Sequence, residues 1–268
     1  MTIADAAHKL TQLSQGQQLM WIGQRLHPDA PLYNMIFTFT IEGALNVDAF
    51  RCAYAVLQTC ANLRTVISEI DGVPQQVSGG TATSPLEWID LSGEVNPTAA
   101  LQRWVDLRRT HRFELDKQLY DSALLKTGAQ RFVWYLNLHH IITDVWSAQL
   151  VYTLMAALYV QAAADQVPVL PVLPAYNDYL AHEQQMQGQS AGARTYWETK
   201  LEQPIDFVNL YGEDQPSTSN RTERYPLLLS AAHTEQLAEL ATTSGFRSFT
   251  RDLTYANLFG ALLLAFLH

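Results

Sequence analysis

The stretch RFVWYLNLHHIITDVWSAQL, residues 131–150, contains the features that decide how the chain folds. It is apolar at nearly every position through Leu138, which predicts a central strand covered on both faces. Two adjacent histidines, His139 and His140, end this strand. A helix follows at once, over about residues 147–164, so the stretch predicts a strand, a turn and a helix in direct succession.

The histidine pair has three interpretations: a catalytic group, a metal site, or part of the core. Neighbouring side chains on a strand point to opposite faces, so His139 and His140 cannot share a metal ion unless the strand has already ended. No other histidines at helical metal spacing complete a ligand set, and no metal is expected. Core packing, with Asp144 or Ser147 capping the helix, accounts for these residues without chemistry. A strand end beside a helix start is nevertheless where clefts form, which favours a functional site.

Helix and strand patterns alternate through the rest of the first half. Ser14 and Gln17 have capping-box spacing, and Asp71-Gly72 is a hairpin turn signal. The predicted elements are a helix from Ser14 to Pro28, a strand over 34–43, a helix over 46–62, two strands within 63–78 and a helix over 97–113. This order predicts an α/β (α+β) fold built as a two-layer sandwich.

The second half begins with a linker, because three prolines occur within residues 165–180. The predicted elements beyond it are helices over 176–187 and 191–201, a polar loop over 211–224, a strand at Tyr225–Leu229, and helices over 231–243 and 253–268. We expect an N-terminal lobe over 1–175, a helical connection and loop over 176–222, and the beginning of a C-terminal lobe over 223–268. The last helix is apolar and has no strands of its own to cover, so we expect a longer protein.

Composition excludes several classes of partner. The net charge is -9, and the basic residues are scattered, so no nucleic-acid surface is predicted. Cys52 and Cys60 lack zinc-site or disulfide-framework spacing, which suits a reducing compartment. No leader pattern and no run of about 18 apolar residues occurs, so no membrane association is expected. We expect a cytoplasmic protein.

The string HHIITDVWS, residues 139–147, resembles the HHxxxDG active-site motif of the condensation domains of nonribosomal peptide synthetases. These domains belong to the chloramphenicol acetyltransferase-like acyltransferases. The stretch LSQGQQLMWIGQRLHPDAPLYN, residues 13–34, is similar to their first motif, and NLRTVISEIDGVPQQV, residues 62–77, to their second. The second motif lacks the family's RHE triplet, as do many condensation domains that receive a starter acyl group, including that of enterobactin synthase. The resemblance therefore implies a chloramphenicol acetyltransferase-like lobe followed by the start of a similar one.

The resemblance implies a role for His140 in forming an amide bond. The second histidine would face a tunnel between the lobes and act near the amine of the acceptor aminoacyl thioester, as general base or by stabilising the tetrahedral intermediate. Imidazole suits either task because it changes charge near neutral pH. The substrates would arrive on the 4'-phosphopantetheine arms of donor and acceptor carrier proteins, beside adjacent synthetase domains, and the chain itself would bind no cofactor.

The same resemblance implies supporting roles for the surrounding residues. His139 would be structural, and Asp144 would pair with Arg64 to hold the turn. The following helix would be started by Ser147 and packed by Trp146.

Val145 departs from the motif, which has glycine at this position. A β-branched residue at positive φ is strained by roughly 1 to 3 kcal/mol, whereas at negative φ valine would only narrow the site. Two alternatives to amide formation therefore stay open. One is a catalytically degenerate scaffold or recruitment module, silenced by Val145; the other is a related acyltransferase that acylates a hydroxyl or a free amine.

Overall fold

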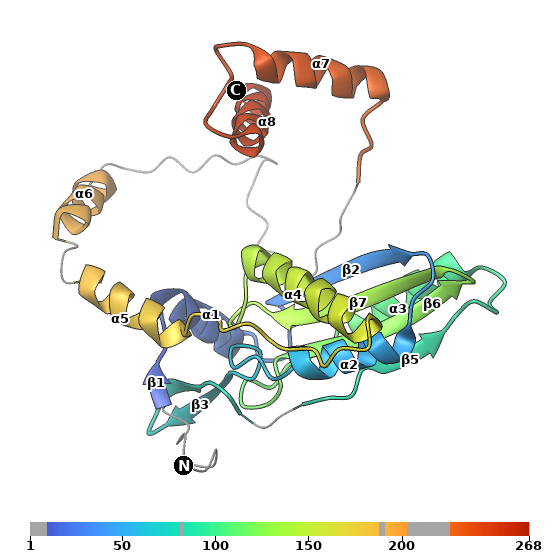
Figure 1. Ribbon diagram of the computed structural model, residues 1–268. Coiled ribbons are helices and arrows are strands. Elements are labelled where there is room, and N and C mark those ends of the chain that lie inside the picture. Colours follow the sequence, from blue (N-terminus) through green and yellow to red (C-terminus); the bar gives the residue numbers. More distant parts are fainter. Residues whose placement is uncertain (1–9, 81–82, 188–190, 203–225, 268) are drawn as a thin grey trace. The chain divides into compact units, whose positions relative to one another are not determined.

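The computed structural model describes residues 10–80, 83–187, 191–202 and 226–267 (Figure 1). The chain divides into two compact units, Met1–Tyr196 and Trp197–His268. This division falls inside the segment predicted as the connection, and the domain limits at residues 175 and 222 stay predictions.

The first unit contains two sheets and most of the helices. Its elements are β1 (Leu10–Gln12), α1 (Gln15–Leu26), β2 (Asn34–Glu42), α2 (Val47–Leu57), β3 (Val66–Ile70), β4 (Val73–Val77), β5 (Glu87–Asp90), α3 (Pro97–Arg108), β6 (Tyr120–Gly128), β7 (Arg131–His139), α4 (Val145–Ala163) and α5 (Tyr176–Gln187). Helix α6 (Ala191–Leu201) spans the division. The second unit adds α7 (Ala231–Thr242) and α8 (Arg251–Leu267).

The larger sheet has the strand order β2-β7-β6-β5, so β7 is an interior strand as predicted. Strand β2 pairs with β7 antiparallel in nine residue pairs, from Asn34 with His139 to Glu42 with Arg131. Strand β6 is also antiparallel to β7, whereas β5 is parallel to β6. A smaller sheet has the order β1-β4-β3.

Helices cover both faces of the larger sheet (Figure 1). On one face, Trp134 and Leu138 of β7 pack in a core with residues of α2 and α4. On the other face, Tyr135 packs with Trp104 of α3. The α/β class is confirmed, while the two-layer description omits α3: this lobe has three layers, because both faces of β7 are apolar and need cover.

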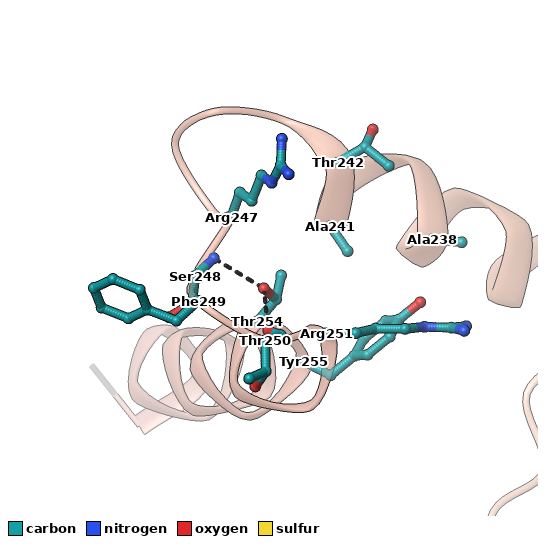
Figure 2. A pocket seen from close by; sticks show the side chains of 10 residues that line it. All are labelled: Ala238, Ala241, Thr242, Arg247, Ser248, Phe249, Thr250, Arg251, Thr254 and Tyr255. Carbon is teal, nitrogen blue, oxygen red and sulfur yellow. Dashed lines mark hydrogen bonds between the residues drawn. The ribbon is translucent and has the colours of Figure 1, made fainter.

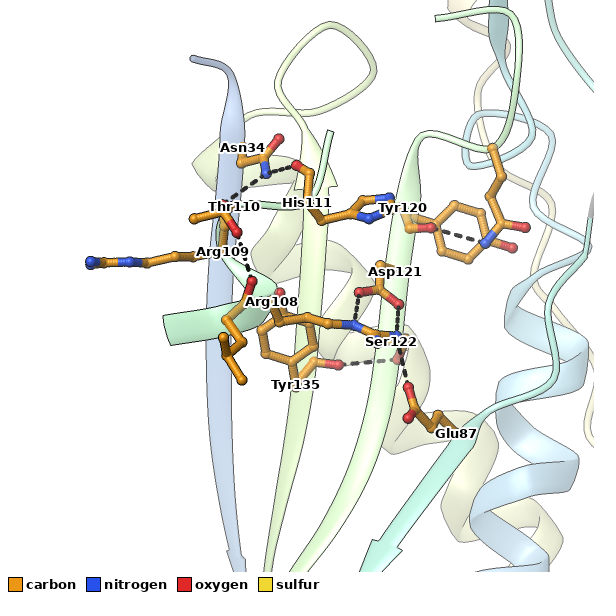
Figure 3. Close-up of polar contacts among 12 residues, drawn as sticks. Asn34, Glu87, Arg108, Arg109, Thr110, His111, Tyr120, Asp121, Ser122 and Tyr135 are labelled. Carbon is orange, nitrogen blue, oxygen red and sulfur yellow. Dashed lines mark hydrogen bonds and ion pairs between the residues drawn. The ribbon is translucent and has the colours of Figure 1, made fainter. Parts of the chain in front are cut away.

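Arg108, in the last turn of α3, connects that helix to the sheet (Figure 3). Its guanidinium donates to both carboxylate oxygens of Asp121 on β6, at 2.7 and 3.0 Å, and to Glu87 on β5 at 2.7 Å. The paired, planar donors of arginine suit such a contact with two carboxylates. Nearby, the Asn34 side chain donates to the carbonyl oxygens of Arg109 and His111, which keeps the segment after α3 beside β2.

Local sequence signals explain several element boundaries. The predicted capping box at Ser14 and Gln17 is present at the start of α1. Strands β3 and β4 meet at Asp71 and Gly72, both with positive φ (52° and 80°), which is the hairpin geometry that this dipeptide favours. These predictions are confirmed.

The strand predicted at Tyr225–Leu229 is wrong over its described part, since residues 226–229 form no strand. Tyr225 and the polar loop over 211–224 lie outside the described residues. A strand needs a partner for its backbone groups, and a local apolar pattern does not reveal whether one is near. Among the described residues, no helix is both long and apolar enough to cross a membrane.

Candidate active site

The turn between β7 and α4 is fixed by backbone hydrogen bonds. His139 donates its N–H to the carbonyl of Leu119 at 2.9 Å, and His140 donates to the carbonyl of Tyr33 at 2.8 Å. The N–H of Ile142 returns to the carbonyl of His139 at 3.1 Å, which closes the turn. The chain then enters α4 at Val145.

His139 is buried, with 1% of its surface exposed. Its Nδ1 accepts the N–H of Ile141 at 3.1 Å, and its ring contacts Tyr33 and Phe113. Burial, together with the charge of His140, lowers the pKa of His139 to about 4. The imidazole is therefore neutral near pH 7, and it holds the turn as an acceptor.

His140 is half-buried and differs from its neighbour in what its ring contacts. Its Nδ1 lies 2.8 Å from the carbonyl oxygen of Thr143. A carbonyl can only accept, so Nδ1 carries the hydrogen of the neutral ring and Nε2 keeps a lone pair. This tautomer leaves Nε2 able to accept a proton from a substrate. Thr143 contributes through its backbone, which no residue-type signal could have predicted.

Asp144 is the N-cap of α4. Its Oδ1 accepts hydrogen bonds from the backbone nitrogen and the hydroxyl of Ser147, both at 2.6 Å. These bonds lower the pKa of Asp144, and the nearby charge of His140 adds to the shift. Capping is one of the interpretations that the sequence left open, and the geometry supports it.

The predicted ion pair between Arg64 and Asp144 is wrong in this structure. The guanidinium of Arg64 donates instead to the carbonyl oxygen of Thr59 at 2.9 Å. The carboxylate of Asp144 accepts its hydrogen bonds from Ser147. The N-terminus of α4 supplies N–H donors next to the aspartate in sequence, so the carboxylate is satisfied without a distant cation.

Val145 is the first residue of α4, and its φ is not positive. The strain that a glycine would relieve is therefore absent. The side chain is 69% exposed, and two further apolar side chains on the first turns of α4, Trp146 (73%) and Leu150 (50%), are also exposed. Trp146 thus does not pack within the described lobe as predicted. These three residues form an apolar surface directly after the histidine turn.

The sequence-predicted site residues otherwise gather around one turn, with Arg64 as the exception. No cluster of three or more histidine, cysteine, aspartate or glutamate side chains suitable for a metal occurs in the described part of the chain. A surface hollow of about 490 Å³ lies in the second unit, lined in part by Arg247, Arg251 and Tyr255 (Figure 2). It contains none of the predicted site residues.

A central strand that ends in a buried and a half-buried histidine, followed by a capped helix, is the chloramphenicol acetyltransferase-like architecture that the motifs predicted. The family model described as Condensation domain matches residues 8–264, and the chain belongs to this family. Condensation domains are acyltransferases that form amide bonds.

Curated relatives share this family. A linear gramicidin synthase protein of Brevibacillus parabrevis is 31% identical over 268 residues, which is 96% of this chain and 3% of that protein. The isonitrile lipopeptide synthase of Streptomyces coeruleorubidus is 27% identical over 270 residues, covering 96% of this chain and 17% of that protein. The chain thus spans a small part of the curated relatives that it matches.

Solved structures give the same class. The starter condensation domain of rhizomide synthetase RzmA, as a mutant in complex with C8-CoA, superimposes with a TM-score of 0.70 at 27% identity. The match covers 78% of this chain and 49% of that one. A further mutant of the same domain, solved with C8-CoA and Leu-SNAC, also has a TM-score of 0.70 at 26% identity, over 77% of this chain and 48% of that one.

Proposed function

We propose that this chain is part of a condensation domain that transfers a carrier-bound acyl group to the amine of a carrier-bound amino acid. The observation that supports this most directly is the hydrogen bond from His140 to Thr143, which leaves Nε2 unprotonated at the turn. The amine nitrogen would attack the thioester carbon, forming the C–N bond and breaking the C–S bond. His140 would accept the amine proton at Nε2 and return it to the departing thiolate.

The donor proposed is a starter acyl group rather than a peptide. The exposed apolar surface of Val145, Trp146 and Leu150, next to His140, suits an apolar acyl chain. The likeness to a starter condensation domain solved with C8-CoA supports the same class of donor. We propose donor and acceptor carrier proteins with 4'-phosphopantetheine arms, and adjacent synthetase domains, as partners in the cytoplasm.

The test uses the full-length domain with a donor carrier loaded with an octanoyl group and an acceptor carrier loaded with an amino acid, with products read by mass. We expect the acyl-aminoacyl product from the parent and none above background from His140→Ala. His182→Ala, on the exposed surface of α5, is the matched control and should retain parental activity. An His140→Ala variant as active as the parent would refute the catalytic assignment.

The same assay separates the two alternatives. Turnover with a free amine or alcohol and no acceptor carrier would indicate the related acyltransferase. Carrier binding without product for any donor, unaffected by His140→Ala, would indicate the scaffold. The absence of positive φ at Val145 removes the backbone reason for a silenced site.

A further inference from the structure

A pair of buried glutamine side chains lies behind the histidine turn. Gln17, in the first turn of α1, is 5% exposed, and Gln76 on β4 is fully buried. The Nε2 of Gln17 donates to the carbonyl oxygen of Ile141, the residue after His140, at 3.0 Å. It is thus a side chain from a distant element that reaches the backbone of the turn.

The two amides satisfy each other and leave one defined orientation. Each Nε2 donates to the other Oε1 at 3.1 Å. The Oε1 of Gln17 also accepts the N–H of Ser14, and the Nε2 of Gln76 donates to the carbonyl of Gln12, both at 3.0 Å. Reversing the Gln17 amide would place two oxygens together at Ile141, so the network sets which atom faces the turn.

The contact acts on the peptide unit between Ile141 and Ile142. Its carbonyl is held by Gln17 and its N–H by the carbonyl of His139. This unit lies within the loop that joins His140 to Thr143, whose carbonyl fixes the His140 ring. Releasing one end of the peptide would allow it to rotate, and the Thr143 carbonyl would no longer be held where Nδ1 needs it.

We propose that Gln17 is a positioning residue that keeps the His140 ring in its proton-accepting tautomer by donating to the Ile141 carbonyl. The proposal rests on the proposed function for its kinetic consequence. Its structural consequence, the state of the His140 ring, is independent of turnover.

Gln17→Glu isolates the donated hydrogen bond. Glutamate serves in a capping box as well as glutamine does, so the contact with Ser14 is retained, but an ionised carboxylate cannot donate to Ile141. We expect kcat to fall about tenfold or more at high pH, with KM changed much less. Burial raises the pKa of a carboxyl group, so protonation should restore a donor, and kcat relative to the parent should recover between about pH 9 and pH 6.

Gln76→Glu is the matched control. It places the same group at an equally buried position and keeps an acceptor for Gln17, but it does not touch Ile141. We expect a similar loss of thermal stability without pH-dependent recovery of kcat. Parental kcat in Gln17→Glu, or the same recovery in Gln76→Glu, would overturn the proposal.

The ring state of His140 is read by ¹⁵N NMR. The parent should show hydrogen on Nδ1, and Gln17→Glu at high pH should show a mixture of tautomers; an unchanged ring spectrum would also contradict the proposal. A parent that is inactive yet shows this tautomer difference would refute the proposed function alone. If Gln17→Glu does not fold, Gln17→Met, which is neutral and cannot donate, should lower kcat at all pH values, and parental kcat would refute the role.

Discussion

Asp144 accepts two hydrogen bonds from Ser147 at 2.6 Å, one from the backbone and one from the hydroxyl. The carboxylate thus serves the first turn of the helix that follows the catalytic turn. It caps α4, and the cap defines where the loop after His140 ends.

Removing this cap should destabilise the lobe measurably. We expect Asp144→Ala to lower the free energy of unfolding by about 1 kcal/mol, because N-cap removal typically costs that much. Asp144→Asn keeps an acceptor and should lose clearly less. Urea unfolding of both variants measures the difference, and equal losses would show that the negative charge matters rather than the cap.

Arg64 and Asp144 should behave as independent sites. Their side chains contact Thr59 and Ser147, respectively, so a double-mutant cycle of Arg64→Ala and Asp144→Ala should be additive within about 0.5 kcal/mol. The measurement is the unfolding free energy of the parent, both single variants and the double variant. A larger coupling energy would restore the ion pair that the motif implied.

Val145 should not silence the site. Since its φ is not positive and its side chain is exposed, Val145→Gly relieves no strain and adds flexibility to the first turn of α4. We expect a loss of stability of up to about 1 kcal/mol and less than about a threefold change in kcat. Val145→Ala is the control for side-chain removal alone. A large gain in kcat for glycine over alanine would show that valine restricts the backbone.

His139 should make stability depend on pH in one window. Its folded pKa of about 4 lies below the usual 6.5, so between these values the unfolded chain binds a proton that the folded chain does not. Its contribution is full above about pH 6.5 and is lost as the pH falls to about 4, by up to about 3 kcal/mol.

Urea unfolding at pH 7, 5.5 and 4.5 measures this loss. His139→Gln should remove much of the slope, whereas His182→Gln, on an exposed face of α5, should leave it unchanged. An equally steep slope in His139→Gln would assign the pH dependence to other groups.

Periodicity and capping signals predicted most of the first lobe because they are local. The capping box at Ser14, the Asp71-Gly72 turn and the apolar run into His139 each depend on neighbours in sequence. The strand at 225–229 depends on a partner elsewhere in the fold, and a short apolar pattern does not supply one. The cover provided by α3 depends on tertiary packing in the same way.

The site was predictable in its residue types and less so in its contacts. Motif spacing located His139, His140 and Asp144 on one turn. It assigned Asp144 a cation partner, because a motif records which residues occur and not which atoms meet. The roles of the Thr143 carbonyl and of Gln76 are carried by the backbone and by an ordinary buried amide, and neither has a signature in a single sequence.

The nine pairs between β2 and β7 have a consequence for how the two identical side chains are told apart. A slip of one residue along this ladder would turn every side chain of β7 to the opposite face. His140 would then take the place of His139 inside the lobe, and the accessible nitrogen would be lost. Faithful strand alignment during folding is therefore as necessary for chemistry as the histidine itself, and a misaligned chain would be compact but inert.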